Sequence, residues 1–449
     1  MQTTLSKKLN VLIIFVLLAG MVWRPAPALS AEGDSPGSSE IRKPAEAFRF
    51  DLRVLSYGII QQPSDSSQNP GNNFLQIPRY TGNLEFRPDL ALKTDSLDLM
   101  AKPRLRLEYR EWEEGSREGR GDWESDLYVN EWLARWKANE NLFVSYGREN
   151  LQWGPSFLFS PSNPFFPDNG RRNPYEEVPG MDFGRVIWIP DSAWTVSFIA
   201  NTDEGRNDIN LPGPFERAYA LKMDYQGREG YGSVILTHRE NSENSLGFYG
   251  GVTLSDAVLV YAEGAMIRHD YALYPRRDGS PFGASMERIH ADDSTVQPAI
   301  LLGSSYTFAE GGTFTGEYAY YGPGYSGAEA DRYYVLRRKA AEALAYGGPI
   351  SGLGRLTLWQ TVNTGLRHLR RNYALLQYNR NNIEDCIDLT FRWTQNLDDW
   401  SGQLTALGSY ILGNHIQLFA VGTVNGGRGD TEFGGLLDYQ CMMGLQYTF

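Results

Sequence analysis

Long hydrophobic runs, cysteine and histidine are all scarce in this sequence of 449 residues. After residue 31, no apolar run approaches the roughly 18 residues that a membrane-spanning helix requires. Any crossing of a membrane must therefore be made by strands closed into a barrel, the other structure that satisfies every backbone polar group within lipid.

The 5 histidines and 2 cysteines offer little material for chemistry. No Cys/His spacing typical of a metal site occurs, and no glycine-rich phosphate loop leads from a strand into a helix. The Ser/His or Asp/His sets of barrel hydrolases are not recognisable either. The nearest candidate is His269-Asp270, which is more typical of a boundary between strand and loop. We expect no metal, no cofactor and no enzymatic activity.

A disulfide is not expected between the two cysteines. Cys441 lies on the apolar face of the last strand, whereas Cys386 lies on the polar face of residues 387–393. Two side chains on opposite faces of one wall cannot bond to each other. The argument weakens if Cys386 precedes its strand, in a turn.

Positive charge is also in short supply. The chain has 42 Lys and Arg against 54 Asp and Glu, which gives a net charge of -12. The first 31 residues hold Lys7, Lys8 and Arg24 and no acid, so the chain without them carries -15. This balance argues against a nucleic-acid partner.

The first 31 residues have the pattern of a secretory signal peptide. Lys7 and Lys8 precede the apolar run from Val11 to Ala19, and small residues from Ala26 to Ala31 offer a cleavage site. Residues 32–46 are polar, without core-forming side chains, and are expected to be a flexible lead. We therefore predict export of the mature chain.

What the sequence does contain is alternation. From Leu437 to Phe449 every odd position is apolar or aromatic, which is the period of a strand with one greasy face. Tyr439, Tyr447 and Phe449 lie near the two ends of that face, as the aromatic belts of a membrane barrel require. At this strand the chain resembles the outer-membrane β-barrel proteins of Gram-negative bacteria. The resemblance implies that Phe449 is the signal recognised by the barrel assembly machinery.

Similar alternation continues without a linker from residue 47 to residue 449. We predict one all-β domain over this range, a closed antiparallel transmembrane β-barrel with short periplasmic turns and long extracellular loops. A plain count gives about nineteen segments, but bringing Phe449 back to the periplasm needs an even number. We predict about 18 strands, within a range of 16 to 20. Residues 331–344 are the ambiguous segment, either a helix inside a long loop or a further strand.

One stretch combines a strand end with a proline-rich loop. Tyr146-Gly147-Arg148 runs into Trp153-Gly154-Pro155 and then into Ser160-Pro161-Ser162-Asn163-Pro164-Phe165-Phe166-Pro167. These short motifs, with Phe391-Arg392-Trp393 and Thr431-Glu432-Phe433-Gly434, resemble the porin-like alginate-export group. Prolines stiffen a loop and remove backbone donors, so such a loop can fold inward without pairing as a strand.

We accordingly predict possible inward loops at 153–180 and 324–352. The residues assigned to a constriction are Trp153, Pro155, Pro161, Asn163, Pro164 and Phe165. A rigid external loop packed on the rim is an equally good interpretation of the same prolines.

Arginines at alternate strand positions suggest a charged lumen. Arg104, Arg106 and Arg110 alternate with Leu105, Leu107 and Tyr109, and a lipid-facing Arg at the midplane costs roughly 2–4 kcal/mol. We predict a pore lining of these three arginines with Arg355, Arg370 and Arg392. Solvated or lipid-bound arginines remain the simpler alternative for each of them.

The predicted function is an outer-membrane, porin-like channel that passes or exports a small or polymeric solute, anionic or sugar-like. A barrel that sheathes a partner protein is the first alternative, and an outer-membrane hydrolase the second. The implied partners are outer-membrane lipid and lipopolysaccharide, the assembly machinery, and a possible periplasmic or lumen-filling protein.

Overall fold

The structure is a computed structural model that describes residues 47–166, 169–206, 215–240, 244–268, 272–290 and 295–449. The predicted signal peptide at 1–31 and lead at 32–46 lie outside these residues, as do His269 and Asp270. No helix in the described ranges combines the length and apolarity needed to cross a membrane.

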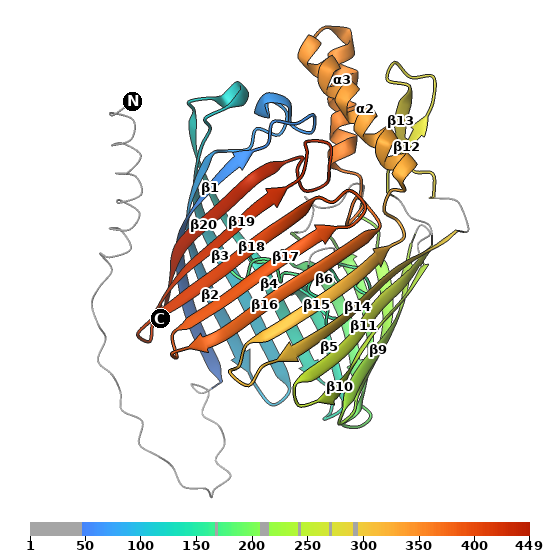
Figure 1. Cartoon of the computed structure of the whole chain (residues 1–449). Coiled ribbons are helices and arrows are strands. Elements are labelled where there is room, and N and C mark those ends of the chain that lie inside the picture. Colours follow the sequence, from blue (N-terminus) through green and yellow to red (C-terminus); the bar gives the residue numbers. More distant parts are fainter. Residues whose placement is uncertain (1–46, 167–168, 207–214, 241–243, 269–271, 291–294) are drawn as a thin grey trace, which may run out of the picture.

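Eighteen antiparallel strands close into a barrel (Figure 1), which confirms the predicted fold class and strand number. Each strand pairs with its neighbours in chain order, and β20 pairs with β1 from Thr448 opposite Arg53 to Leu437 opposite Pro63. The barrel strands are β1 Phe48–Pro63, β2 Tyr80–Lys93, β3 Leu97–Glu111, β4 Gly121–Lys137, β5 Leu142–Glu149, β6 Met181–Trp188, β7 Trp194–Asp203, β8 Ala218–Gln226, β9 Gly230–Arg239, β10 Asn244–Ser255, β11 Val258–Arg268, β14 Val296–Thr307, β15 Thr313–Tyr321, β16 Asn372–Ile383, β17 Ile387–Asn396, β18 Gly402–Leu412, β19 Ile416–Gly426 and β20 Leu437–Thr448.

The two ends of the barrel differ in their connections. At one end, which we call the short-turn end, two to five residues join consecutive strands, as at 256–257 and 308–312. The other end, the long-loop end, carries most of the long segments, among them 64–79, 150–180 and 322–371. The alternation of short turns with long loops was predicted from the turn-forming residues.

The last strand shows how the two faces are used. Met443 and Phe449 on its odd face are exposed, whereas Met442 on its even face is buried inside the barrel against Tyr175 and Phe419. The predicted greasy face of β20 is therefore the outer face. Cys386 lies in the turn before β17 and not on a strand face, and both cysteines are free.

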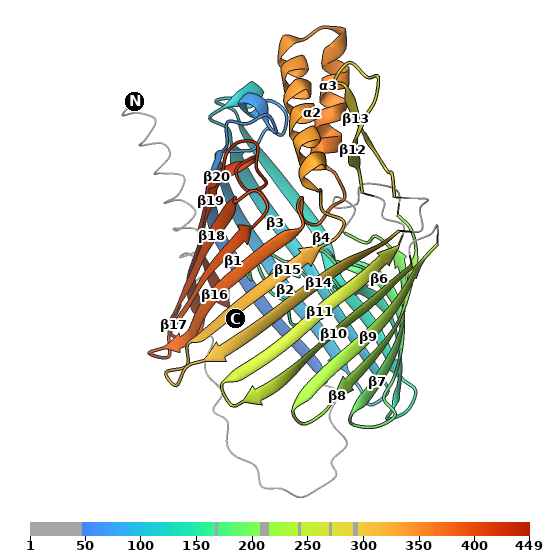
Figure 2. The same ribbon diagram turned by 45° about the vertical axis from the view of Figure 1, so that its right-hand side comes forward.

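A helical cap stands beyond the long-loop end (Figures 1 and 2). It consists of α2 Gly327–Tyr346, α3 Pro349–Val362 and the hairpin of β12 Tyr274–Arg277 and β13 Ala284–Glu287. Ser326 and Glu329 form a capping box that starts α2, so the ambiguous segment 331–344 is a helix. Its tyrosines pack with the hairpin into an aromatic cluster outside the barrel. The predicted inward course of 324–352 was therefore wrong.

The cap is tied to distant loops by a buried arginine. Arg337 of α2 donates to Ser67 Oγ and Gln68 Oε1, both at 3.1 Å, and to the carbonyl of Gly429 at 2.6 Å. These partners belong to the β1–β2 and β19–β20 loops, several strands away around the rim. Two short 3-10 turns, η2 Pro70–Asn72 and η3 Gly115–Arg117, complete this end.

Candidate functional site

The loop 150–180 between β5 and β6 enters the barrel and crosses it. Glu263 of β11, fully buried, accepts hydrogen bonds from the hydroxyls of Ser156, Ser160 and Ser162. Glu317 of β15 accepts the backbone N–H groups of Phe157 and Leu158 at 2.7 and 2.8 Å. Both carboxylates stand on inner wall positions five or more strands away from β6 along the sheet. Because a buried carboxylate needs hydrogen-bond donors, these two glutamates hold the hydroxyl and N–H groups of the loop inside the lumen.

The middle of the loop is fixed by apolar contacts with the nearer wall. Phe165 and Phe166 pack against Phe183 of β6, and the same cluster includes inner residues of β7, β8 and β9. Phe165 also meets Trp153 edge to face, with ring centroids 5.9 Å apart. Asn163, fully buried, accepts the N–H groups of Phe165 and Phe166 and donates to the carbonyl of Leu151.

The remaining constriction residues hold the loop through their backbones. The carbonyl of Pro155 accepts from Arg171, and that of Pro164 accepts from Arg239 at 2.6 Å. Pro161 is buried. The residues predicted for a constriction thus come together in one lumenal loop, where several of them act in its internal packing.

The far end of the loop is fixed by charge. Arg104 of β3, with 1% of its side chain exposed, binds Glu177 through Nε and Nη2 at 2.7 and 2.8 Å. It also binds Asp89 of β2 at 2.8 Å. Tyr175 stacks on Phe419 of β19 with ring centroids 3.7 Å apart. Arg104 therefore faces the interior, but two carboxylates neutralise it.

The other arginines proposed for the lining differ in their settings. Arg110 pairs with Glu108 and Glu124, and Arg106 lies 4.0 Å from Asp126. Arg392 of β17 is buried, with its neighbours Phe391 and Trp393 exposed on the outer face, and donates to Gln377 and to the carbonyl of Arg171.

Two arginines do not lie on a barrel strand. Arg370 belongs to the segment between α3 and β16, where its backbone N–H donates to the hydroxyl of Tyr373. Arg355 is exposed on α3 beyond the rim (Figure 1), so its assignment to the pore lining was wrong. The sequence pattern failed there because a basic residue in a helical cap looks the same as one in a strand.

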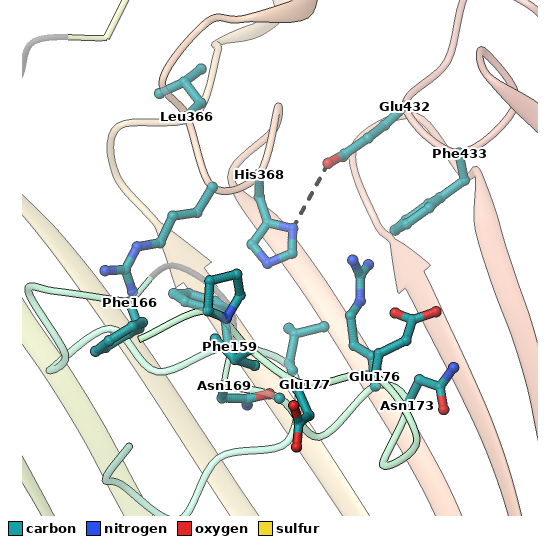
Figure 3. A pocket seen from close by; sticks show the side chains of 16 residues that line it. Phe159, Phe166, Asn169, Asn173, Glu176, Glu177, Leu366, His368, Glu432 and Phe433 are labelled. Carbon is teal, nitrogen blue, oxygen red and sulfur yellow. Dashed lines mark ion pairs between the residues drawn. The ribbon is translucent and has the colours of Figure 1, made fainter. Parts of the chain in front are cut away.

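Three cavities follow one another around the loop. The outer one, of about 500 Å³, lies between the loop and the segments 366–368 and 432–433 (Figure 3). A throat of about 170 Å³ separates the loop from the wall of β16 to β20 and shares Arg172, Glu176 and His368 with the outer cavity. An inner cavity of about 960 Å³ extends toward the short-turn end and shares Phe157 and Arg392 with the throat.

Polar side chains line parts of all three cavities. The wall side of the throat carries Arg392, Thr394, Gln403, Thr405, Thr423 and Gln440. Hydroxyl and amide side chains such as Thr253, Ser305, Asn379 and Thr390 border the inner cavity. Arg172 and Glu176 project from the loop and were missed by the sequence reasoning, because nothing local distinguishes them from other loop charges.

A partly buried carboxylate joins the outer segments above the throat. Glu432 lies 3.8 Å from Nδ1 of His368 (Figure 3) and accepts from Leu369 N, Tyr373 Oη and Asn396 Nδ2. Burial acts to raise the pKa of Glu432, but His368 and these donors outweigh it, so the pKa lies below the usual 4.5. His368 also meets Phe159 of the loop edge to face, with ring centroids 4.9 Å apart.

The described histidines have different contacts, and His290 meets the ring of Tyr274 edge to face. His238 contacts Asn244, His415 contacts the carbonyl of Thr448, and His368 contacts Glu432. No group of three His, Cys, Asp or Glu residues that could hold a metal ion occurs among the described residues.

Comparison with known proteins adds evidence on the fold. No model of a protein family matches the sequence, and no curated protein does. Among solved structures, the outer membrane protein OprD from Pseudomonas aeruginosa is similar with a TM-score of 0.52 and 8% identity, over 90% of this chain and 94% of that one. OccK7 (OpdD) of the same organism gives 0.53 and 9%, over 90% and 98%. OccK11 (OpdR) gives 0.51 and 11%, over 90% and 96%.

At these identities the likeness defines the fold, a large closed antiparallel barrel. The resemblance to the alginate-export group stays one of short sequence motifs.

Proposed function

We propose that the protein is a porin-like channel of the outer membrane for small anionic or sugar-like solutes. The observation that carries the proposal is the series of three cavities that share lining residues, from the segments 366–368 and 432–433 down to the short-turn end. In this proposal the short turns face the periplasm and the long loops face outside.

The attachment of the lumenal loop favours a small solute over a polymer. The throat beside the loop has a volume of about 170 Å³, below that of the cavities on either side. The loop that narrows it is held by two buried glutamates, an apolar cluster and Arg104, so widening it requires breaking several of these contacts. Export of a bulky polymer would require the loop to leave the lumen.

The arginines at the throat and the polar side chains around the inner cavity favour anions and sugars as solutes. Arg392 and Arg172 both border the throat, and an arginine fork binds carboxylate, phosphate or sulfate oxygens. Glu176 opposes them in part. Hydroxyl and amide groups around the inner cavity can donate to and accept from a polyol without holding it by charge.

The alternatives have less support. A sheath for a partner protein needs an open lumen, whereas here the chain's own loop occupies it. A hydrolase needs a nucleophile beside a base, and the contacts of His238, His368 and His415 are with Asn244, Glu432 and the carbonyl of Thr448, none of which is a nucleophile. The outer-membrane location and the assembly machinery as a partner remain part of this proposal. Phe449 is 55% exposed on the outer face and meets the ring of Tyr447 edge to face.

Conductance of the purified protein in planar bilayers tests the proposal. A salt gradient should give a reversal potential with anion preference. Arg392→Gln should lower that preference about fivefold at most, because one charge at close range is worth roughly 1 kcal/mol in a wet pore. Arg355→Gln is the matched control, since it removes the same charge from the exposed cap.

Absence of any pore in a correctly folded preparation would refute the channel. Equal effects of the two substitutions would refute the role of Arg392.

A further inference from the structure

A row of polar side chains crosses the inner wall of the barrel from β4 to β6. Arg135 of β4 lies directly opposite Ser145 of β5, and Ser145 lies directly opposite Arg185 of β6. Directly opposed residues have Cα atoms about 4.5–5.5 Å apart and side chains on one face of the sheet. That face is the inner one, because Ser145 is 4% exposed while its neighbours Val144 and Tyr146 are exposed on the outside.

The row lies on the short-turn side of the lumenal loop. The strand β6 begins at Met181, where the loop ends, and runs to the short turn at 189–193. Arg185 therefore comes two positions after Phe183, the residue against which the loop packs. None of the three described residues of the row lines the throat or the cavities on either side of it. The row is thus a place in the lumen apart from the throat.

The row contains donor groups without partners. Nε of Arg135, Oγ of Ser145 and Nε of Arg185 are buried, and no other described residue makes a hydrogen bond to any of these three atoms. A buried polar group without a partner costs free energy, and such groups are few in a folded protein. Three of them side by side on neighbouring strands indicate a ligand that accepts hydrogen bonds.

The two arginines differ in what holds them. Nη1 of Arg185 donates to both oxygens of Glu149, at 3.2 and 3.0 Å. The other edge of this guanidinium, which carries Nε and Nη2, has no partner among the described residues. No hydrogen bond or ion pair joins Arg135 to any described residue. Asp98, directly opposite Arg135 on β3, lies 2.9 Å from Nζ of Lys137 instead.

The charge around the row is positive. The inner positions of 98–102, 131–137, β5 and β6 hold four cations against three carboxylates, namely Lys102, Arg135, Lys137 and Arg185 against Asp98, Glu131 and Glu149. The three carboxylates are paired with Lys137, Lys102 and Arg185, at 2.9, 2.8 and 3.0 Å. Arg135 is the cation that remains within this described stretch. A bound anion would neutralise it and would accept from the donors beside it.

We propose that Arg135, Ser145 and Arg185 form a binding site for a small tetrahedral oxyanion, a phosphate or sulfate group. The open guanidinium edges of the two arginines donate to its oxygens from two sides, and the hydroxyl of Ser145 donates from the wall between them. Donors on three strands match an anion with at least three oxygens better than a planar carboxylate with two. Binding itself requires no conduction, and only an effect of the bound anion on ion current rests on the proposed channel function.

Equilibrium binding of radiolabelled inorganic phosphate to the full-length protein in detergent tests the proposal. Sulfate is the competitor, and chloride at the same ionic strength is the control for general screening of charge. We expect saturable phosphate binding that sulfate displaces and chloride leaves in place.

Two substitutions remove a donor of the site without breaking a contact among the described residues. Arg135→Gln should weaken phosphate binding about tenfold, and Ser145→Ala should weaken it by a smaller factor, since a hydrogen bond to a charged group is stronger when the donor is charged too. Neither should lower the thermal unfolding temperature, because each removes a group that has no native partner. Two matched controls remove the same charge elsewhere, Arg355→Gln from the exposed cap and Arg392→Gln from the throat.

Loss of phosphate binding in Arg355→Gln equal to that in Arg135→Gln would mean attraction by net charge and would overturn the proposal. Loss in Arg392→Gln but not in Arg135→Gln would place the bound phosphate in the throat and would also overturn it. So would the absence of saturable phosphate binding to the folded protein, whether or not the protein conducts ions. A protein that binds phosphate at this row without conducting would refute the channel and support the site. If one of the two substitutions prevents folding, the other decides.

Discussion

The two walls that hold the lumenal loop differ in chemistry. The wall of β6 to β9 has strands of 8 to 10 residues and presents Phe183, Ile199 and Ile235 to the loop. The wall of β1 to β4 has strands of 14 to 17 residues and presents buried charges such as Glu85, Arg87 and Arg104.

One loop thus meets an apolar wall through Phe165 and Phe166 and a charged wall through Glu177. Apolar contacts are insensitive to pH and strengthen with the area that they bury. Ion pairs depend on both partners and on the protonation of the carboxylate. The comparison indicates that both walls hold the loop, but only the contribution of the charged wall depends on pH.

The largest effect is expected on the apolar side. Phe166→Ala removes a buried ring from the cluster. It should weaken the docking of the loop to the wall by about 3–5 kcal/mol, the usual cost of removing a buried Phe side chain. In single-channel recordings the open-state current should become larger and noisier. Phe449→Ala changes an exposed ring far from the loop and is the control in inserted protein. A quiet, unchanged current would show that the apolar wall is dispensable.

A smaller effect is expected on the charged side. Arg104→Gln leaves Glu177 without its main cation, but Asp89 keeps Arg53 at 3.0 Å, and both carboxylates are partly exposed to water. We therefore expect about 1–3 kcal/mol of loop destabilisation, below the cost of fully buried pairs. Current noise should rise less than in Phe166→Ala.

Anion preference is the second readout of the same variant. It should change little, because Arg104 is already neutralised. A large loss of anion preference in a quiet channel would show that Arg104 attracts the solute directly.

The smallest effect concerns pH. The lowered pKa of Glu432 means that its stabilising contribution is fully present above the usual value of 4.5 and is lost as the pH falls through the lower folded value. The thermal unfolding temperature of the wild type should thus fall further than that of Glu432→Gln when the pH is taken from 7 to below 4. The difference between the two proteins isolates this carboxylate from others that titrate in the same range. Parallel curves would contradict the assignment.

Much of the fold could be predicted from the residues alone. Strand positions such as β14 and β15 follow from alternation and from the turn residues between them. The inward direction of Arg392 follows from the apolar side chains on each side of it. The proline-rich loop was located correctly in sequence. The choice between an inward and an external course could not be made, because prolines stiffen a loop in either direction.

The sequence by itself determined which residues form strands and which face of each strand is apolar, because alternation is a local property with a period of two residues. Only the tertiary structure decided which charges pair and where the loop 150–180 lies. It also placed the helices α2 and α3, with Arg355, outside the barrel. Arg104 meets a carboxylate 73 residues away, and Ser160 meets one 103 residues away. Such contacts arise when the barrel closes and brings distant inner positions around one lumen, and no spacing along the chain records them.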